Sequence, residues 1–551
     1  MNPVIQREFF GILRSPKAFA ALLTLTVAFS MAVLMRWPSD AKVDLSGEQS
    51  IGVFRVFGYG LLAGVIFLVP AFPASSIVKE KNKGTLALLL NSPLKSSSIY
   101  LGKLAGVLLF SLLVLLSSLP AAAACFAMGG VELTGGLGLL YFVLALLVVQ
   151  YATLGMMVSS YVQSSDAGVR LTYGIVLGLC FLTLVPHAFY QGDNGYLPVF
   201  AQWLRFFSPL PVVMRIMGHG AVTSRGLMEA PSGTPEFVSM TIATWFVFGA
   251  ITLSRLNYRI FDRARAQGVM TDDRGLPSRM ARRLFYVVDP QRRKPGIPWY
   301  LNPVMVKEFR CRRFGRSQWL LRLVAGCALT SMLLTFAAAT SVVSWGVETI
   351  GGLMVFLQVI LVVVLTPSLA AGLISGERDS GGWELLRMTP ISSSKIVRGK
   401  LLSVVWTLLL VLMATVPGYL VMIYIKPVMW LQVNLVLICL AWTAVYALSV
   451  SAAVGSLFRN TAVATTSSYV TVMSLFLIPM LVWLGRDAPF GHDTVQLALM
   501  INPVGAALSV IEAPGFSNYD LLPATWWVAG VVSSFMFLVF GVQVWRLTRP
   551  V

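Results

Sequence analysis

The chain has 551 residues, of which 57% are hydrophobic and 12% are charged, and its formal net charge at pH 7 is +19. An ordinary soluble domain is about 45–50% apolar and about 25% charged, so this composition excludes a soluble protein and indicates a membrane protein. The positive charge requires no nucleic-acid partner, because a basic cytoplasmic face beside anionic lipid accounts for it.

Twelve apolar stretches are long enough to cross a bilayer as helices of about 20 residues. We expect these spans near residues 18–35, 56–78, 104–126, 134–161, 171–190, 236–254, 319–339, 350–374, 401–424, 429–457, 462–484 and 525–545. The first stretch is not a secretory signal, because it ends in "AVLMRW" without a small-residue cleavage site. The sequence therefore predicts an all-α integral membrane protein with about 12 transmembrane helices.

The distribution of Lys and Arg predicts the orientation of these spans, because cytoplasmic loops are enriched in positive charge. Placing the N-terminus inside puts most of the basic residues on the cytoplasmic side. Twelve crossings return the chain to that side, so we expect both termini in the cytoplasm.

The second half of the chain repeats the first. "NPVIQREF" at residues 2–9 matches "NPVMVKEF" at 302–309. Further matches at a nearly constant offset (377 − 80 = 297; 469 − 173 = 296) join Glu80, Pro93, Lys103 and Tyr173 to Glu377, Pro390, Lys400 and Tyr469. A steady offset over so many features indicates a duplication.

The duplication predicts the domain organisation. Six spans fall in residues 1–254, a basic cytoplasmic linker follows at 255–301, and six more spans fall in 302–551. Because six is an even number, the halves are parallel repeats, and such repeats are expected to enclose a pathway between them.

No catalytic or metal site is expected. The central turns of the predicted spans lack Asp, Glu, Lys, Arg and His, whereas secondary carriers usually keep such residues near the midplane. The five cysteines and three histidines do not show the spacing of metal ligands. The Gly-Lys pairs at 102–103 and 399–400 are followed by Leu, so they do not form a phosphate-binding loop. We therefore expect neither enzyme activity nor a cofactor in this chain.

Each half carries one charged loop with a short helix signal. Gly84 and Gly381 permit a turn, "TLALLL" and "WELLRM" then supply a short apolar face, and Pro93 and Pro390 end the helix. An exposed amphipathic helix of this kind is a docking element for a partner. Alternatively, it only anchors the loop at the membrane surface.

These loops resemble the cytoplasmic loop between spans two and three of the ABC type-two exporter permeases. The "NPV" segments ending in "REF" and "KEF" are similar to the amphipathic segment before the first span in that family, and the resemblance covers nearly the whole chain, twice. It implies that each loop holds a coupling helix that docks on a separate ATP-binding subunit. The residues it assigns to coupling are Glu80, Gly84, Thr85, Pro93 and Lys103 in the first loop, and Glu377, Arg378, Gly381, Glu384, Pro390 and Lys400 in the second.

The two halves depart from the family pattern at different positions. The first loop has Ala87 where a Glu is expected, and the second has Gly382 in place of Thr. The docking surfaces are therefore unlike, which leaves open whether they meet one kind of ATPase subunit or two. The candidates in the N-terminal interfacial segments are Arg7, Glu8, Lys307 and Glu308. Both glutamates either have a functional role or only pair with neighbouring arginines.

The resemblance implies a permease subunit of an ATP-driven exporter in the cell membrane, with the bacterial cytoplasmic membrane as the expected location. Two copies of an ATP-binding cassette subunit would bind ATP and Mg²⁺, and membrane lipid and accessory membrane or extracytoplasmic subunits are further expected partners.

The outer connections at 187–235 and 485–525 resemble re-entrant helices, with surface loops as the alternative. An apolar interface favours lipids, hydrophobic drugs or peptides as cargo. A secondary carrier without an ATPase and an ATPase-coupled scaffold or sensor stay open as other functions.

Overall fold

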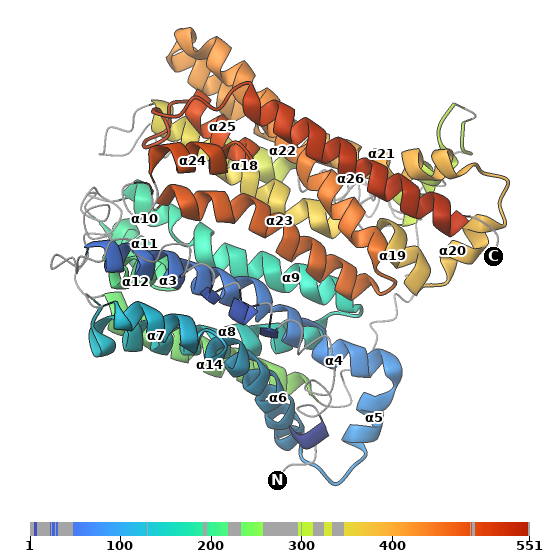
Figure 1. Cartoon of the computed structure of the whole chain (residues 1–551). Coiled ribbons are helices and arrows are strands. Elements are labelled where there is room, and N and C mark those ends of the chain that lie inside the picture. Colours follow the sequence, from blue (N-terminus) through green and yellow to red (C-terminus); the bar gives the residue numbers. More distant parts are fainter. Residues whose placement is uncertain are drawn as a thin grey trace, which may run out of the picture. The chain divides into compact units, whose positions relative to one another are not determined.

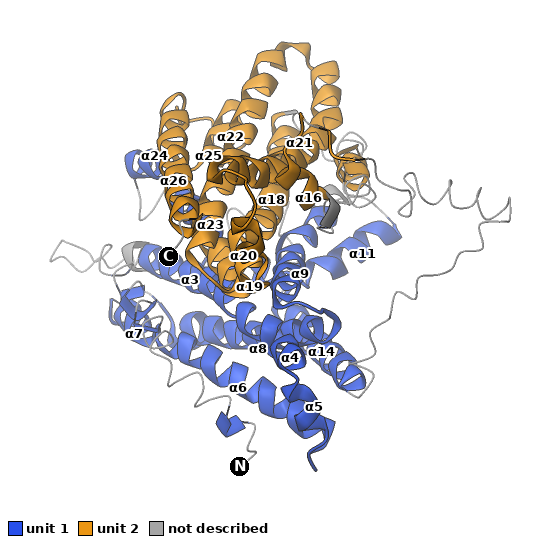
Figure 2. Ribbon diagram, turned by 90° about the vertical axis from the view of Figure 1, so that its right-hand side faces the viewer, with its two compact units in different colours: residues 1–261, 341–344, 473–498 blue, residues 262–340, 345–472, 499–551 orange. Residues whose placement is uncertain are grey.

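The computed structural model describes residues 51–128, 131–190, 195–218, 233–256, 300–311, 324–332, 347–484 and 491–548, together with short pieces at 5–7, within 22–33, and at 48–50, 296–298 and 486. Every regular element in these ranges is a helix, so the predicted all-α class is confirmed. The chain divides into two compact units (Figure 2). The first comprises residues 1–261, 341–344 and 473–498, and the second comprises 262–340, 345–472 and 499–551. The boundaries predicted at residues 254 and 302 stay a prediction.

The helices of the first half surround α8, which packs against α4, α6, α9 and α14 (Figure 1). The bounds are α3 (Glu48–Leu68), α4 (Ala71–Lys83), α5 (Thr85–Leu90), α6 (Ser96–Leu116), α7 (Leu119–Ala127), α8 (Leu139–Tyr161), α9 (Ser165–Leu177), α10 (Val185–Tyr190), α11 (Tyr196–Arg205), α12 (Leu210–Ile216) and α14 (Gly233–Arg255). The π-helical turns η1 (Leu133–Gly138) and η2 (Gly178–Leu182) precede α8 and follow α9.

In the second half α22 takes the place of α8 and packs against α18, α19, α25 and α26. The bounds are α16 (Pro303–Cys311), α18 (Val347–Ala370), α19 (Gly372–Asp379), α20 (Gly382–Arg387), α21 (Ser393–Ile425), α22 (Trp430–Leu457), α23 (Thr461–Leu484), α24 (His492–Leu499), α25 (Pro503–Val510) and α26 (Ala524–Thr548), with the 3₁₀ turn η5 (Pro427–Met429) before α22.

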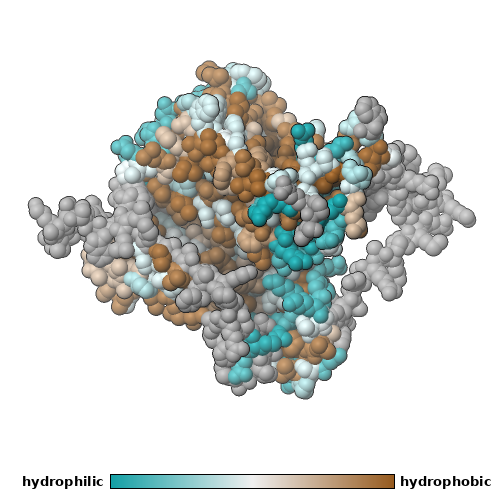
Figure 3. Space-filling model, turned by 45° about the vertical axis from the view of Figure 1, so that its right-hand side comes forward, coloured by the Kyte–Doolittle hydropathy of each residue, from teal (hydrophilic) through white to brown (hydrophobic). Residues whose placement is uncertain are grey.

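Ten helices in the described residues are long and apolar enough to cross a membrane, and the number rises to 12 if two bent pairs each count as a span. Each of the ten coincides with a predicted span. The other two predicted spans, 18–35 and 319–339, lie largely outside the described residues. Much of the surface visible in Figure 3 is hydrophobic, as expected for helices that face lipid.

The two connections that we predict to lie outside the membrane each contain a helix, a sharp break and a second helix. Tyr196–Arg205 and Leu210–Ile216 are bent by 68°, and His492–Leu499 and Pro503–Val510 are bent by 113°. Pro209 and Pro503 stand at the breaks, where a proline cannot continue a helix because it has no N–H to donate. Helix pairs of this form fit the predicted re-entrant segments better than simple surface loops do.

One hydrogen bond occurs at matching positions in both halves. The Tyr173 hydroxyl donates to the carbonyl of Phe67, and the Tyr469 hydroxyl donates to the carbonyl of Val364 at 2.7 Å. Each carbonyl lies three residues before a proline, Pro70 or Pro367, that interrupts the backbone hydrogen bonds of its span. The predicted tandem repeat is therefore present at the level of single contacts.

Exposed aromatic side chains indicate where the bilayer meets the second unit. Trp406 and Tyr424 are exposed on α21, and Trp527 and Trp545 are exposed on α26. Each pair is 18 residues apart (424 − 406; 545 − 527), which is about 27 Å along a helix and close to the roughly 30 Å of a hydrocarbon core. Because Trp and Tyr collect at membrane interfaces, we place the two bilayer surfaces at these rings. The residues of α21 before Trp406 are then expected to lie outside the hydrocarbon core, at the level of the lipid headgroups.

Candidate functional site

Each charged loop folds as a glycine turn followed by one short helix. Gly84, between α4 and α5, has φ of 74°, and Gly381, between α19 and α20, has φ of 75°. Side chains other than glycine rarely adopt this left-handed conformation, so the residue type determines where the span ends. The predicted glycine turns and short helices are confirmed in both loops. Pro93 and Pro390 are exposed and follow the ends of α5 and α20.

One face of each short helix packs inward. Leu86 is fully buried and belongs to a cluster with Ile99, Tyr100 and Leu256, the residue just after α14. In the second half, Trp383 and Leu386 are buried, and the Trp383 indole N–H donates to the carbonyl of Leu547 in α26 at 3.2 Å. Each short helix is therefore attached to the end of the last span of its own half.

The opposite face of each short helix is apolar and exposed. Leu88 on α5 and Leu385 on α20 occupy matching positions (385 − 88 = 297), and both are 70% exposed. Met388, at the end of α20, is exposed as well, and Glu384 is the exposed acidic residue beside it. Neither leucine is needed for packing within the chain, so this face is available for contact with another molecule.

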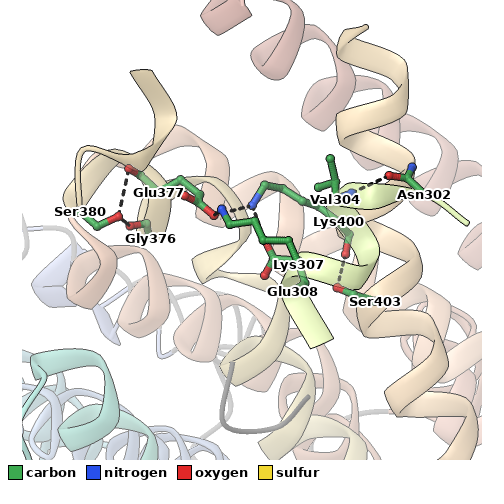
Figure 4. Close-up of polar contacts among 9 residues, drawn as sticks. All are labelled: Asn302, Val304, Lys307, Glu308, Gly376, Glu377, Ser380, Lys400 and Ser403. Carbon is green, nitrogen blue, oxygen red and sulfur yellow. Dashed lines mark hydrogen bonds and ion pairs between the residues drawn. The ribbon is translucent and has the colours of Figure 1, made fainter. Parts of the chain in front are cut away.

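A buried charge cluster lies behind α20 (Figure 4). The Lys400 ammonium, at the start of α21, has no exposed surface and lies 2.7 Å from Glu308 Oε1 and 3.2 Å from Glu377 Oε1. Lys307 Nζ, which is partly exposed, lies 2.6 Å from the same Glu377 oxygen. Two positive and two negative charges are thus joined within hydrogen-bonding distance, an arrangement that a buried lysine requires.

The first half has a matching cluster. Lys103 Nζ, with only 1% of its side chain exposed, lies 2.9 Å from Glu80 Oε2, and Arg7 pairs with the other oxygen of that carboxylate. Glu8 lies outside the described residues. In both halves the lysine of the Gly-Lys pair therefore holds the glutamate that stands just before the glycine turn.

The glycine of the second Gly-Lys pair allows a close contact between α16 and α21. A Cβ atom added to Gly399 would lie 2.7 Å from Asn302 Oδ1 and 2.8 Å from Val304 Cβ, shorter than any ordinary contact. Asn302 also donates from Nδ2 to the carbonyl of Lys395 at 2.7 Å and accepts from the amide of Val304 at 3.0 Å. The pair "GK" thus encodes a helix contact followed by a buried cation.

The predicted site residues fall into two groups. Glu80, Lys103, Glu377, Lys400, Arg7, Lys307 and Glu308 form the buried clusters, whereas the following residues are exposed or half-buried in the loops themselves: Gly84, Thr85, Pro93, Arg378, Gly381, Glu384 and Pro390. Glu308 pairs with the distant Lys400, a partner that the sequence analysis did not name. A signal for this arrangement was present, because the Glu-to-Lys spacing is 23 in both loops (103 − 80; 400 − 377).

Leu88, Leu385 and Met388 were not among the predicted site residues. The sequence shows only an apolar run, and the exposed fraction of each side chain depends on how the short helix is rotated against its neighbours. Within the described residues, no group of three or more His, Cys, Asp or Glu side chains could hold a metal ion.

Comparison with known families bears on both halves. Residues 26–254 match a family model described as ABC-2 family transporter protein, and residues 303–504 match a second model with the same description. No curated protein matches the chain. The matched ranges include both charged loops and nearly all of the spans.

Proposed function

The chain belongs to the ABC-2 family of transporter proteins through both of its halves, as a membrane permease component of an ABC system. We propose that it forms the substrate pathway of an exporter and that separate ATPase subunits drive the transport. One subunit docks on the exposed face of α5 and another docks on that of α20. We call α5 and α20 the docking helices from here on.

The observation that carries this proposal is the matched exposure of Leu88 and Leu385. Both leucines stand on a short helix behind a left-handed glycine, with the opposite face of that helix packed against the chain. An exposed apolar side chain on a firmly held helix is a typical anchor for a hydrophobic groove on a partner. Two such anchors support two ATPase subunits per chain.

ATP and Mg²⁺ belong to the partner subunits in this proposal. Neither Gly-Lys pair forms a phosphate-binding loop, because Lys103 and Lys400 are held in buried ion pairs and Gly399 lies in a helix contact. Closure of the ATPase subunits would push on both docking helices, and rocking of the two halves would open the pathway alternately to the two sides. The absence of Asp, Glu, Lys, Arg and His from the central turns of the ten candidate spans supports an apolar cargo.

The experiment is purification of the tagged chain from its native membrane in mild detergent, with mass spectrometry of associated proteins and an ATPase assay. We expect a stoichiometric ATP-binding protein with the wild-type chain, and its loss from the double variant L88E/L385E. The matched control is V428E, since Val428 is an equally apolar, highly exposed residue in the loop between α21 and α22 at the other end of these helices. A wild-type chain that purifies alone and shows no ATPase activity under gentle extraction would overturn the proposal.

Glu80 and Glu377 are unsuitable for this experiment, although the family resemblance assigns them to docking. Their carboxylates point into the clusters of Lys103 and Lys400. A charge reversal there would place two cations together inside the chain, and a lost partner could then reflect a damaged loop.

A further inference from the structure

The charge cluster behind α20 joins three separate elements. Glu308 belongs to α16, Glu377 to the end of α19, and Lys400 to the start of α21. Figure 4 shows the Lys400 side chain reaching both carboxylates with its ammonium end. The cluster therefore connects the interfacial helix that precedes the first span of this half with the loop that carries the docking helix.

The docking helix α20 depends on neighbouring contacts for its position. It has only six residues, which is too short for a helix to be stable by itself, and Gly381 before it has no neighbouring atom within 4 Å of an added Cβ. Two attachments lie on either side of this glycine. Glu377, four residues earlier, is held by Lys400, and Trp383, two residues later, is held by Leu547.

The same plan is present in the first half. Glu80, four residues before Gly84, pairs with Lys103, and Leu86, two residues after Gly84, is buried in the cluster that includes Leu256. Arg7, from the N-terminal segment, completes the ion pair with Glu80. A glycine hinge between a charged attachment and an apolar attachment thus occurs twice at matching positions.

We propose that Lys400 is a positioning residue that joins docking helix α20 to α16 through Glu377 and Glu308, so that both move as one body with the start of α21. In the first half Glu80 has the corresponding place, because it binds both Lys103 at the start of α6 and Arg7 of the N-terminal segment. Sliding one element past another would leave a buried charge unpaired, and this cost resists gradual deformation. A push on α20 therefore reaches α16 and α21 through the cluster. The ATPase as the source of that push rests on the proposed function, whereas the linkage itself is a property of the chain alone.

The linkage can be tested in the purified chain by hydrogen exchange, without an ATPase. W383A removes the apolar attachment and loosens α20. In the wild-type background we expect W383A to speed exchange in residues 382–387 and also in 303–311, by roughly threefold or more. In the background K400M/E308Q/E377Q, which replaces the cluster by uncharged groups, W383A should speed exchange in 382–387 only.

The control background is K395M, which removes an exposed lysine five residues before Lys400 on α21. In this background the faster exchange in 303–311 should persist. Should the triple variant fail to fold, E377A serves as the second background, because it removes both ion pairs of Glu377 and leaves Lys400 paired with Glu308. Spread to 303–311 in a background that lacks the Glu377 carboxylate, or no spread in the wild type, would each overturn the proposal.

An ATPase that purifies with the chain adds a second readout. Addition of a non-hydrolysable ATP analogue should then alter exchange in 303–311 of the wild type and not of the uncharged variant, even though both bind the ATPase equally. If no ATPase purifies with the chain, the proposed function fails, and the W383A result still decides whether the linkage exists.

Discussion

Replacing Lys400 by Met should destabilise the chain far more than an ordinary surface substitution. Methionine has nearly the length of lysine and fills the same space, so the change removes the charge and leaves little cavity. The Glu308 carboxylate, only 3% exposed, then loses the ammonium 2.7 Å away, while Glu377 keeps its contact with Lys307 at 2.6 Å. The perturbation is therefore concentrated on a single buried carboxylate.

The expected cost follows from that geometry. Removing one partner of a buried ion pair typically costs about 3–5 kcal/mol, because an uncompensated charge is left behind. Replacing both partners by uncharged groups is often nearly neutral, so K400M/E308Q should recover most of the loss. The double variant should thus be more stable than the single variant K400M, although it differs more from the wild type.

The assay is SDS titration of the purified chain in mixed micelles, followed by circular dichroism, with the four chains of a double-mutant cycle measured side by side. K395M, an exposed lysine on the same helix, should change stability by no more than about 0.5 kcal/mol. A K400M chain within about 1 kcal/mol of the wild type would contradict the assignment of Lys400 as a buried, paired cation. So would a K400M/E308Q chain that is less stable than K400M.

Three further predictions concern the turns, the repeated tyrosines and the bilayer. G84A and G381A should each cost about 1–2 kcal/mol of local stability, because alanine is strained at positive φ. No neighbouring atom obstructs the added Cβ, so the cost comes from the backbone alone. Faster hydrogen exchange in α5 or α20 would show this cost, and unchanged exchange would refute the left-handed turns. Y469F should cost about 0.5–1.5 kcal/mol in SDS titration, because it removes the hydroxyl that donates to the carbonyl of Val364, and an equally stable variant would contradict that contact. Spin labels at Trp527 and Trp545 should both report headgroup depth in nanodiscs, while a label at Phe535, which is also exposed, should report the hydrocarbon centre. Equal depths at all three positions would rule out the placement.

The features predicted correctly from the sequence depend on local signals. A span is recognised by a long apolar run, and each of the ten spans in the described residues was predicted. The glycine turns at Gly84 and Gly381 were predicted because only glycine adopts positive φ at little cost. The re-entrant form of the two connections was expected from the family resemblance, and the breaks at Pro209 and Pro503 agree with the inability of proline to donate in a helix. Each of these signals needs no knowledge of neighbouring elements.

The clusters behind the docking helices could not be predicted in this way. Glu308 and Lys400 are 92 residues apart, and nothing in either segment states that the two meet. For Glu308 the sequence left open a functional role or a pair with a neighbouring arginine, and it did not indicate Lys400. Burial of Lys400 against α16 depends on the approach that Gly399 allows, which is a property of packing between two helices.

The differences between the two loops show which positions are constrained from inside the chain. The glutamate before the glycine, the glycine itself, the proline and the lysine are the same in both halves, and each has an internal reason in turn geometry or ion pairing. Thr85 and Ala87 correspond to Gly382 and Glu384, so the positions without such a reason have diverged.

Leu88 and Leu385 do not fit that division. They face outward, have no packing role within the chain, and yet are the same residue with the same exposed fraction in both halves. Exposed leucines are unfavourable in water, since burial of such a side chain contributes about 1.5–3 kcal/mol. An apolar residue retained at matching outward positions is therefore best explained by a contact that lies outside the chain. Because the residues around each leucine differ, the proposed docking predicts partner surfaces that share a leucine-sized groove and differ at its rim, where the second loop has the exposed carboxylate of Glu384 and the first has Ala87.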